Sequence, residues 1–209
     1  MKVHRSRSVL RPRVTVDGQG LVSHAGVALL SELADQSGLT GGLSHAMAGC
    51  GIRWRRHDPG VVLAHLAVAV ADGADCLSDM AVLREQAALF GRVASRPTAW
   101  RAVQAVACVE QRAIVEAIAE ARARVWTAAG LDLGEVTLDF DATLIDSYSE
   151  KQDAAPTYKR GFGFHPFAVW CDQTNEPLAA MLRPGNAGAN NTNDHLELLD
   201  ARSTASPCR

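Results

Sequence analysis

The sequence contains few aromatic residues, no Cys-x-x-Cys pair and no excess of basic residues. Aromatic residues make up 5% of the 209 residues. Ala, Val and Leu dominate the apolar set, which favours alanine-rich helices over a β-sandwich. The five cysteines (Cys50, Cys76, Cys108, Cys171 and Cys208) are widely spaced, so they predict free thiols in a reducing compartment and no zinc site. With 23 acidic and 21 basic residues, the chain is not a globally basic nucleic-acid binder, although it can carry local basic patches.

The sequence also lacks a long hydrophobic run. The longest, Val61 to Ala71, contains His65 and is too short to span a bilayer. The N-terminus carries charge without a following apolar segment, so it does not resemble a signal peptide. These features predict a cytoplasmic protein of one or two domains with no membrane partner. Because 47% of its residues are hydrophobic, the chain can bury a core.

Residues 1–130 are predicted to form an all-helical region that follows a basic N-terminal arm. The arm, residues 1–13, has five cations and no acid, so it is either a solvated segment or one that lies on phosphate. An Asp17-Gly18 turn precedes the helices, and residues 41–58 are expected to form a basic, glycine-containing connection. Helices are expected over 23–38, from Asp58-Pro59 to 71, over 75–90 and, as one long amphipathic helix, from 96 to 129.

Near residue 135 the hydrophobic period changes from 3.6 to 2. Val136, Leu138 and Phe140 alternate with Thr137, Asp139 and Asp141, which is typical of a strand with one apolar and one acidic face. Further strands are expected over 164–171 and 176–182, separated from the first by a polar loop over 147–163. A helix begins at Asp194. Residues 131–209 therefore have the order β-β-β-α, and the fold class is α+β.

The acidic face of the first strand is the most informative feature. Asp139 and Asp141 lie two residues apart and leave the same face, where two carboxylates repel each other. A divalent cation relieves this repulsion, and hard oxygen ligands select Mg²⁺ or Mn²⁺. The alternative is an edge strand with an exposed polar face. The sequence predicts a metal-binding role for both residues.

The segment LDFDATL at 138–144 resembles the nucleophile motif of haloacid-dehalogenase-like phosphatases. By that resemblance Asp139 would be the nucleophile and Asp141 the acid/base. In that superfamily the motif opens the domain, whereas here it follows a long helical region. Too few residues follow Asp141 for the remaining parallel strands, so this interpretation ranks lower.

Longer segments resemble bacterial insertion-sequence transposases of the DDE type, DDE domain group 1. They include LDFDATLI at 138–145, SEKQDAAPTYKRGFGFHP at 149–166 and EPLAAMLRPGNAGANNTNDH at 176–195. Three upstream segments, at 22–40, 57–86 and 89–103, resemble the N-terminal part of the same proteins. The resemblance covers about residues 1–200.

The resemblance implies a ribonuclease-H-like catalytic domain that cleaves and transfers DNA strands with Mg²⁺ or Mn²⁺. Asp141 would be the first acid of the catalytic triad, with Asp139 as the second choice, and both would bind metal. The partner would be DNA, in particular the terminal inverted repeats of the element, bound by a homo-oligomer in the nucleoid. No segment matches the later acids of the family.

The chain is therefore expected to be a C-terminally truncated transposase with a partial catalytic domain, inactive alone and of marginal stability. Residues 202–209 lack apolar periodicity. If they are written with GC-rich codons, a shifted reading frame of the same bases encodes a peptide that continues the helix. We expect a frameshifted tail, with simple truncation as the alternative. A non-catalytic DNA-binding regulator from such a truncated gene is a further alternative.

Two segments are candidates for DNA contacts. The loop Tyr158–His165 combines Lys159 and Arg160 with aromatic residues and glycines, which suits a phosphate backbone. A helix that begins after Ser95 carries Arg96, Thr98 and Arg101 in its first turns, and with the preceding helix it resembles a helix-turn-helix. The alternatives are a solvated hairpin loop and an ordinary capped helix.

Overall fold

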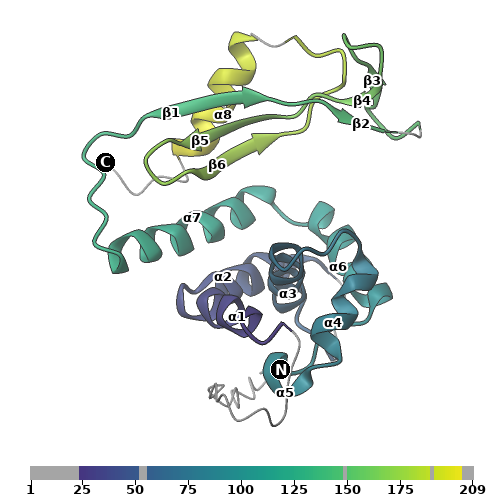
Figure 1. Cartoon of the computed structure of the whole chain (residues 1–209), viewed down its shortest axis with the longest axis vertical. Coiled ribbons are helices and arrows are strands. Elements are labelled where there is room, and N and C mark those ends of the chain that lie inside the picture. Colours follow the sequence, from purple (N-terminus) through teal and green to yellow (C-terminus); the bar gives the residue numbers. More distant parts are fainter. Residues whose placement is uncertain (1–23, 52–55, 148–149, 189–190, 204–209) are drawn as a thin grey trace. The chain divides into compact units, whose positions relative to one another are not determined.

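The structure is a computed structural model that describes residues 24–51, 56–147, 150–188 and 191–203 (Figure 1). The chain divides into a helical unit, residues 1–124, and a unit that contains the strands, residues 125–209. Helices together with two antiparallel sheets agree with the predicted α+β class. The basic arm, the predicted Asp17-Gly18 turn and residues 204–209 of the expected frameshifted tail lie outside the described residues. None of the helices in the described part has the length and apolar character needed to cross a bilayer.

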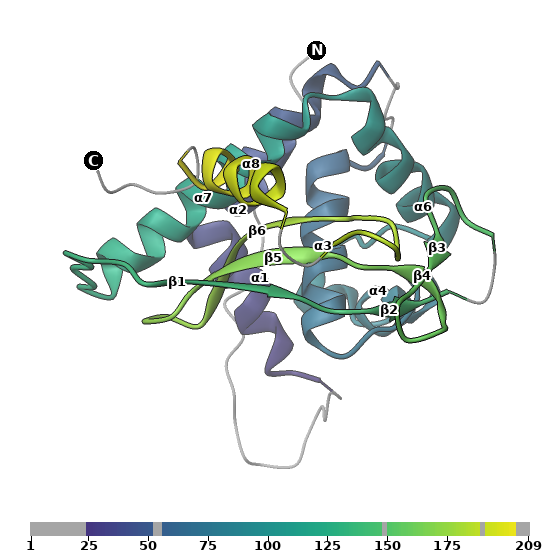
Figure 2. The same ribbon diagram turned by 90° about the horizontal axis from the view of Figure 1, so that it is seen from above.

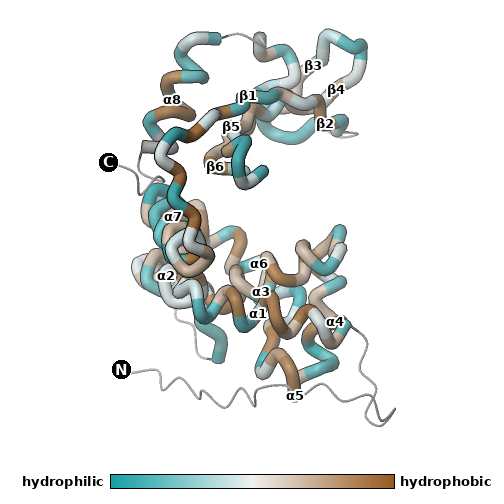
Figure 3. Tube along the Cα trace, turned by 60° about the vertical axis from the view of Figure 1, so that its left-hand side comes forward, coloured by the Kyte–Doolittle hydropathy of each residue, from teal (hydrophilic) through white to brown (hydrophobic). Residues whose placement is uncertain are grey.

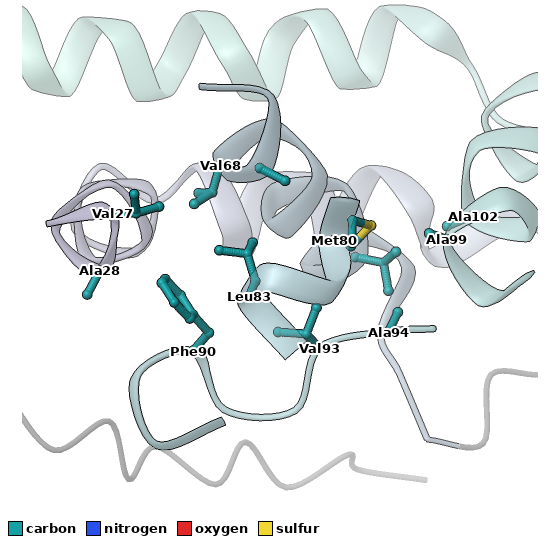
Figure 4. Packing of buried hydrophobic residues seen from close by; sticks show 12 residues of the cluster. Val27, Ala28, Val68, Met80, Leu83, Phe90, Val93, Ala94, Ala99 and Ala102 are labelled. Carbon is teal, nitrogen blue, oxygen red and sulfur yellow. The ribbon is translucent and has the colours of Figure 1, made fainter. Parts of the chain in front are cut away.

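Short helices around one apolar core form the helical unit. They are α1 (Val27–Gln36), α2 (Leu39–Ala46), α3 (Pro59–Ala71), α4 (Ala81–Arg84), α5 (Ala87–Phe90) and α6 (Arg96–Ala105), with 3-10 helices at Met47–Gly49, Leu77–Met80 and Val106–Cys108. Figure 4 shows side chains from α1, α3 and α6 converging on Met80, Leu83 and Phe90. The helical character of this region follows the expectation from sequence.

The start of α3 is as predicted from Asp58-Pro59. The Asp58 side chain accepts hydrogen bonds from the backbone N–H groups of Gly60 (2.8 Å) and Val61 (3.1 Å), and Pro59 occupies the first helical position. The predicted connection over 41–58 is wrong in its first part, because α2 occupies residues 39–46. A Cβ on Gly60 would overlap the backbone of Leu43 and Ser44, so this glycine allows α2 and α3 to pack closely.

Two predicted helices are broken into shorter pieces. Between 75 and 90, the Asp79 carboxylate accepts hydrogen bonds from the backbone N–H groups of Asp75 and Cys76, and a new helical turn begins at Leu77. The expected long helix after residue 96 ends at Ala105, and α7 (Gln111–Ala128) begins after an extended Val109. Val109 packs on the cluster around Met47, so tertiary burial overrides the helical period.

The burial of His65, on α3, indicates how the stability of the helical unit depends on pH. The side chain is 8% exposed, and its Nδ1 is buried without a hydrogen-bond partner in the described part of the chain. Burial lowers the His65 pKa; Asp35 partly opposes this, and His57 adds to it. The unfolded chain therefore binds a proton at His65 more readily than the folded chain does. Above about pH 6.5 His65 is neutral in both states and does not reduce the free energy of unfolding. As the pH falls from there towards the lower pKa of the folded state, the unfolded chain is favoured and the free energy of unfolding decreases.

We therefore expect the free energy of unfolding to fall between pH 7.5 and 5.5, by at most about 1.4 kcal/mol per pH unit from this group. Urea unfolding followed by far-ultraviolet circular dichroism measures the change. His65→Leu should flatten the pH dependence relative to the unchanged chain. The same slope in both proteins would show that His65 does not protonate on unfolding.

The larger sheet contains β1 (Leu138–Ala142), β5 (Phe167–Cys171) and β6 (Glu176–Met181) in the order β1-β5-β6. Both pairings are antiparallel, with Asp139 opposite Trp170 and Asp141 opposite Ala168. Figure 2 shows these strands side by side with α8 (Thr192–Ser203) over one face. The first and third predicted strands and the final helix are confirmed.

A second, smaller sheet lies where a polar loop was expected. Its strands are β2 (Ile145–Asp146), β3 (Ala155–Pro156) and β4 (Phe162–Phe164), in the order β2-β4-β3. The predicted strand over 164–171 is interrupted between β4 and β5 at His165-Pro166, because proline has no N–H to donate to a ladder. The chain therefore passes from one sheet to the other at this joint.

The inner face of the larger sheet packs against α8 and the end of α7. Its buried residues are Trp126, Phe167, Val169, Cys171, Leu178 and Leu198. Trp126 Nε1 donates a hydrogen bond to Glu176 Oε2 (2.9 Å), which ties the end of α7 to β6. On α8, Leu198 is buried against the sheet, whereas Leu196 is exposed.

Candidate functional site

Asp139 and Asp141 lie on the face of β1 that is turned away from the core. Both are exposed, whereas Leu138, Phe140 and Ala142 between and beside them are partly buried on the opposite face. The tube in Figure 3 changes between hydrophobic and hydrophilic colours along this strand. Two residues of strand span about 7 Å, so both carboxylates reach the same small region of the face. Asp141 Oδ1 accepts a hydrogen bond from the N–H of Ala142 (2.8 Å).

The residues beside the acid pair on β5 were missed by the sequence analysis. Trp170 lies directly opposite Asp139, and Ala168 lies opposite Asp141. Trp170 is 36% exposed, so Asp139 has a large aromatic residue opposite it on β5, and Asp141 has a small one. The signal was present in the alternation along 167–171, which places Trp170 on the outer face once the register is known.

The donor chemistry of this face fits a hard divalent cation. Two carboxylates on an open face supply part of an oxygen ligand set, and water or a DNA phosphate can supply others. Within the described residues, no group of three or more His, Cys, Asp or Glu side chains is arranged to hold a metal ion. Asp139 and Asp141 could by themselves supply only part of a ligand set.

Lys159 and Arg160 lie at the tip of the hairpin between β3 and β4. The turn is closed by a hydrogen bond from the N–H of Thr157 to the carbonyl of Gly161 (2.9 Å), and Gly161 donates to the Thr157 hydroxyl (3.0 Å). Lys159 lies over the ring of Tyr158, which is 71% exposed. The tip therefore presents two cations and an aromatic ring on an ordered turn.

The hairpin and Asp141 belong to the same end of the larger sheet. Asp141 is the penultimate residue of β1, and β2 follows after two residues to pair with β4. The N–H of Thr143 donates to the carbonyl of Pro166, which fixes the chain between the two sheets (3.2 Å). Figure 2 shows the small sheet continuing from the end at which β1 finishes.

A buried arginine supports this end from the core side. Arg183 Nη1 pairs with Asp194 of α8 (2.7 Å), and Arg183 Nε donates to the carbonyl of His165 (3.0 Å). The guanidinium lies 4.6 Å from the centroid of Phe167, the residue opposite Ala142 of β1. Arg183 thus connects β6, the His165-Pro166 joint and α8 around the end of the strand that carries Asp141.

The three residues proposed for DNA contact on α6 have different surroundings. Arg96 is exposed in the first turn. Thr98 is half-buried, and its hydroxyl is within hydrogen-bond distance of Ser95 Oγ (3.1 Å) and of Arg101 Nη2 (3.3 Å). Arg101 also donates from Nε to the carbonyl of Pro97 (3.1 Å). Of the two helices expected for a helix-turn-helix, the first is only the single turn α5.

Comparison with protein families identifies the chain. The family model described as "Transposase DDE domain group 1" matches residues 4–206, nearly the whole sequence. The chain belongs to this transposase family. No curated protein and no solved structure matches it significantly.

Membership of this transposase family agrees with the resemblance noted in the sequence. The alternative phosphatase interpretation relied on a short motif and required parallel strands beside the first strand. In the structure, β1 instead pairs with the antiparallel strand β5. This antiparallel pairing does not provide the parallel neighbour that the phosphatase interpretation requires.

Proposed function

We propose that the chain acts in the transposition of an insertion sequence, by divalent-metal-dependent cleavage and transfer of DNA strands. The observation that carries this proposal is the exposed pair Asp139 and Asp141 on the first strand of the sheet, in a chain of the DDE transposase family. The antiparallel order β1-β5-β6 followed by α8 supports a ribonuclease-H-like sheet. In such a sheet Asp141 is the first acid of the catalytic triad.

The chemistry assigns separate tasks to the residues of this unit. Mg²⁺ or Mn²⁺, when bound, activates a water molecule or a DNA 3′-hydroxyl and neutralises charge on the phosphodiester. Asp141, with Asp139 beside it, would hold the cation on the outer face of β1. Lys159 and Arg160 hold the DNA backbone at the same end of the sheet, where their charge complements phosphate. Hydrolysis by water breaks the bond between phosphorus and the 3′ oxygen and leaves a 3′-hydroxyl and a 5′-phosphate. In strand transfer the 3′-hydroxyl attacks a phosphodiester of the target strand, and the new phosphorus–oxygen bond replaces the bond to the target's 3′ oxygen, which leaves as a hydroxyl.

The partner in this proposal is the DNA at the ends of the element, with its terminal inverted repeats, bound by a homo-oligomer in the cytoplasm on the nucleoid. A non-catalytic DNA-binding role of the same chain stays an alternative. The expectation that residues 1–209 are inactive alone stays a prediction, and assay of the purified chain for Mg²⁺-dependent cleavage checks it.

The proposed function is tested with a plasmid that carries the DNA flanking the gene on both sides. An active transposase that contains residues 1–209 should cut this plasmid at the element ends in Mg²⁺ or Mn²⁺, and EDTA should stop the cutting. Hydrolysis of p-nitrophenyl phosphate without any DNA cleavage would instead support a phosphatase. Binding of the ends without cleavage in any metal would support the non-catalytic role.

A further inference from the structure

The exposed face of α6 is centred on Trp100. Ala99, Ala102 and Ala105 are buried, and Figure 4 shows Ala99 and Ala102 turned towards the core of the helical unit. On the opposite side of the helix, Arg96, Trp100 and Gln104 follow one another at intervals of four residues and form one line. The Trp100 side chain is 54% exposed. The small alanines thus face inwards, and the largest residue of the helix faces solvent.

The surroundings of this face are positively charged. The helix carries Arg96 and Arg101 and no acidic residue, and exposed Arg92 precedes it. His57 lies within electrostatic reach of Arg92 and Arg56, which add to the effect of burial in lowering the His57 pKa. The N-terminus of α6 adds the partial positive charge of its backbone dipole. The start of α6 is therefore a region that favours an anionic partner.

The hydrogen bonds of α6 indicate that Trp100 and Gln104 are more available for contact with a partner than Thr98 and Arg101 are. Thr98 is half-buried and bonded within its own turn, and Arg101 is folded back onto Pro97 and Thr98. Trp100 and Gln104 have open positions in the centre of the exposed face. An exposed tryptophan offers apolar contact to thymine methyl groups and sugars, and Gln is a good partner for adenine in the major groove.

We propose that the exposed face of α6, formed by Arg96, Trp100 and Gln104 with Arg92 beside it, docks double-helical DNA and that Trp100 makes its main sequence-dependent contact. This inference rests on the proposed function in DNA transposition. An α-helix with its side chains is about 10–12 Å across and fits the major groove, which is about 12 Å wide, and the ten residues of α6 extend about 15 Å along it. The absence of acidic residues along this helix favours DNA over an acid-and-base-balanced protein surface.

The experiment measures binding of residues 1–209 to two duplexes by fluorescence anisotropy at several salt concentrations. One duplex contains DNA flanking the gene, and the other is a shuffled sequence of equal composition. Trp100→Ala should weaken binding to the flanking duplex about tenfold and change binding to the shuffled duplex little. Arg96→Gln should weaken binding to both and reduce the salt slope by about one. Arg112→Gln, an exposed arginine of α7 paired with Glu116, is the matched control and should bind as the unchanged chain does.

The outcomes separate this inference from the proposed function. If the unchanged chain prefers the flanking duplex and both α6 variants bind as it does, the α6 surface is wrong while the function stands. If the unchanged chain shows no preference for the flanking duplex, the proposed role at the element ends is at fault. Sedimentation in the absence of DNA tests whether this face instead binds a second copy of the chain. A dimer that Trp100→Ala converts to a monomer would show that this face binds a second copy and would overturn the proposal.

Discussion

Asp141→Ala should abolish DNA strand cleavage by an active transposase that contains this segment and leave binding of the element ends nearly unchanged. The exposed position of Asp141 on β1 means that its removal leaves no buried cavity in the sheet. Loss of a carboxylate that holds the metal should lower the cleavage rate at least about a thousandfold, as removal of a residue from a catalytic constellation does. Single-turnover cleavage of an end-containing plasmid and a gel-shift measurement on the same ends give the two quantities.

Two further variants test whether the loss of cleavage is specific to Asp141. Asp139→Ala tests the neighbouring carboxylate; the larger loss of cleavage marks the first acid of the triad. Asp172→Ala, an exposed carboxylate just beyond the end of β5, is the matched control and should cleave normally. If Asp141→Ala weakened end binding as strongly as cleavage, Asp141 would have a structural role and the proposed site would be wrong.

Arg183→Met should give the largest loss of stability in the unit that contains the strands. Arg183 is 5% exposed and pairs with Asp194, and it also donates to the carbonyls of His165 and Gly188. Removing one partner of a buried ion pair leaves the other charge uncompensated, which costs about 3–5 kcal/mol. Trp126 is buried in this unit, so its fluorescence during urea unfolding reports the change.

The double variant Arg183→Met with Asp194→Leu shows whether the loss of stability comes from the unpaired charge of Asp194 or from the lost packing of the Arg183 side chain. Because it removes both charges, it should regain part of the stability lost in Arg183→Met. Arg112→Met, an exposed arginine of α7 in an ion pair with Glu116, should change the free energy of unfolding little. An Arg183→Met protein as stable as the unchanged chain would show that this ion pair does not hold α8 and the sheet together.

The sequence could predict the elements whose local pattern agrees with their tertiary surroundings. Asp58-Pro59 starts a helix through the side chain of Asp58, and the alternation from Val136 to Asp141 places the two acids on one face of a strand. It could not predict the break after Ala105. There the burial of Val109 against another helix competes with a helical period that continues through the break.

The candidate site likewise contains residues that the sequence could predict and a residue that it could not. Asp139 and Asp141 follow from a period of two, but their neighbour Trp170 depends on the register between β1 and β5, which no local pattern contains. The amphipathic period expected over 96–129 does not reveal which side of α6 is buried: the buried stripe consists of small alanines, and Trp100 is exposed. The small residues pack closest to the neighbouring helices, so size and not hydrophobicity decided which side of α6 faces the core.

The most direct test of the central claim is to find where a divalent cation binds on this chain. Mn²⁺ is titrated into ¹⁵N-labelled residues 1–209, and the paramagnetic broadening of backbone amide signals is measured. We predict that broadening centres on Asp139 to Ala142 and on Ala168 and Trp170 across the strand pair, and that Asp139→Asn with Asp141→Asn removes it. Broadening centred elsewhere, or unchanged in the double variant, would contradict a metal-dependent site on the acidic face of β1.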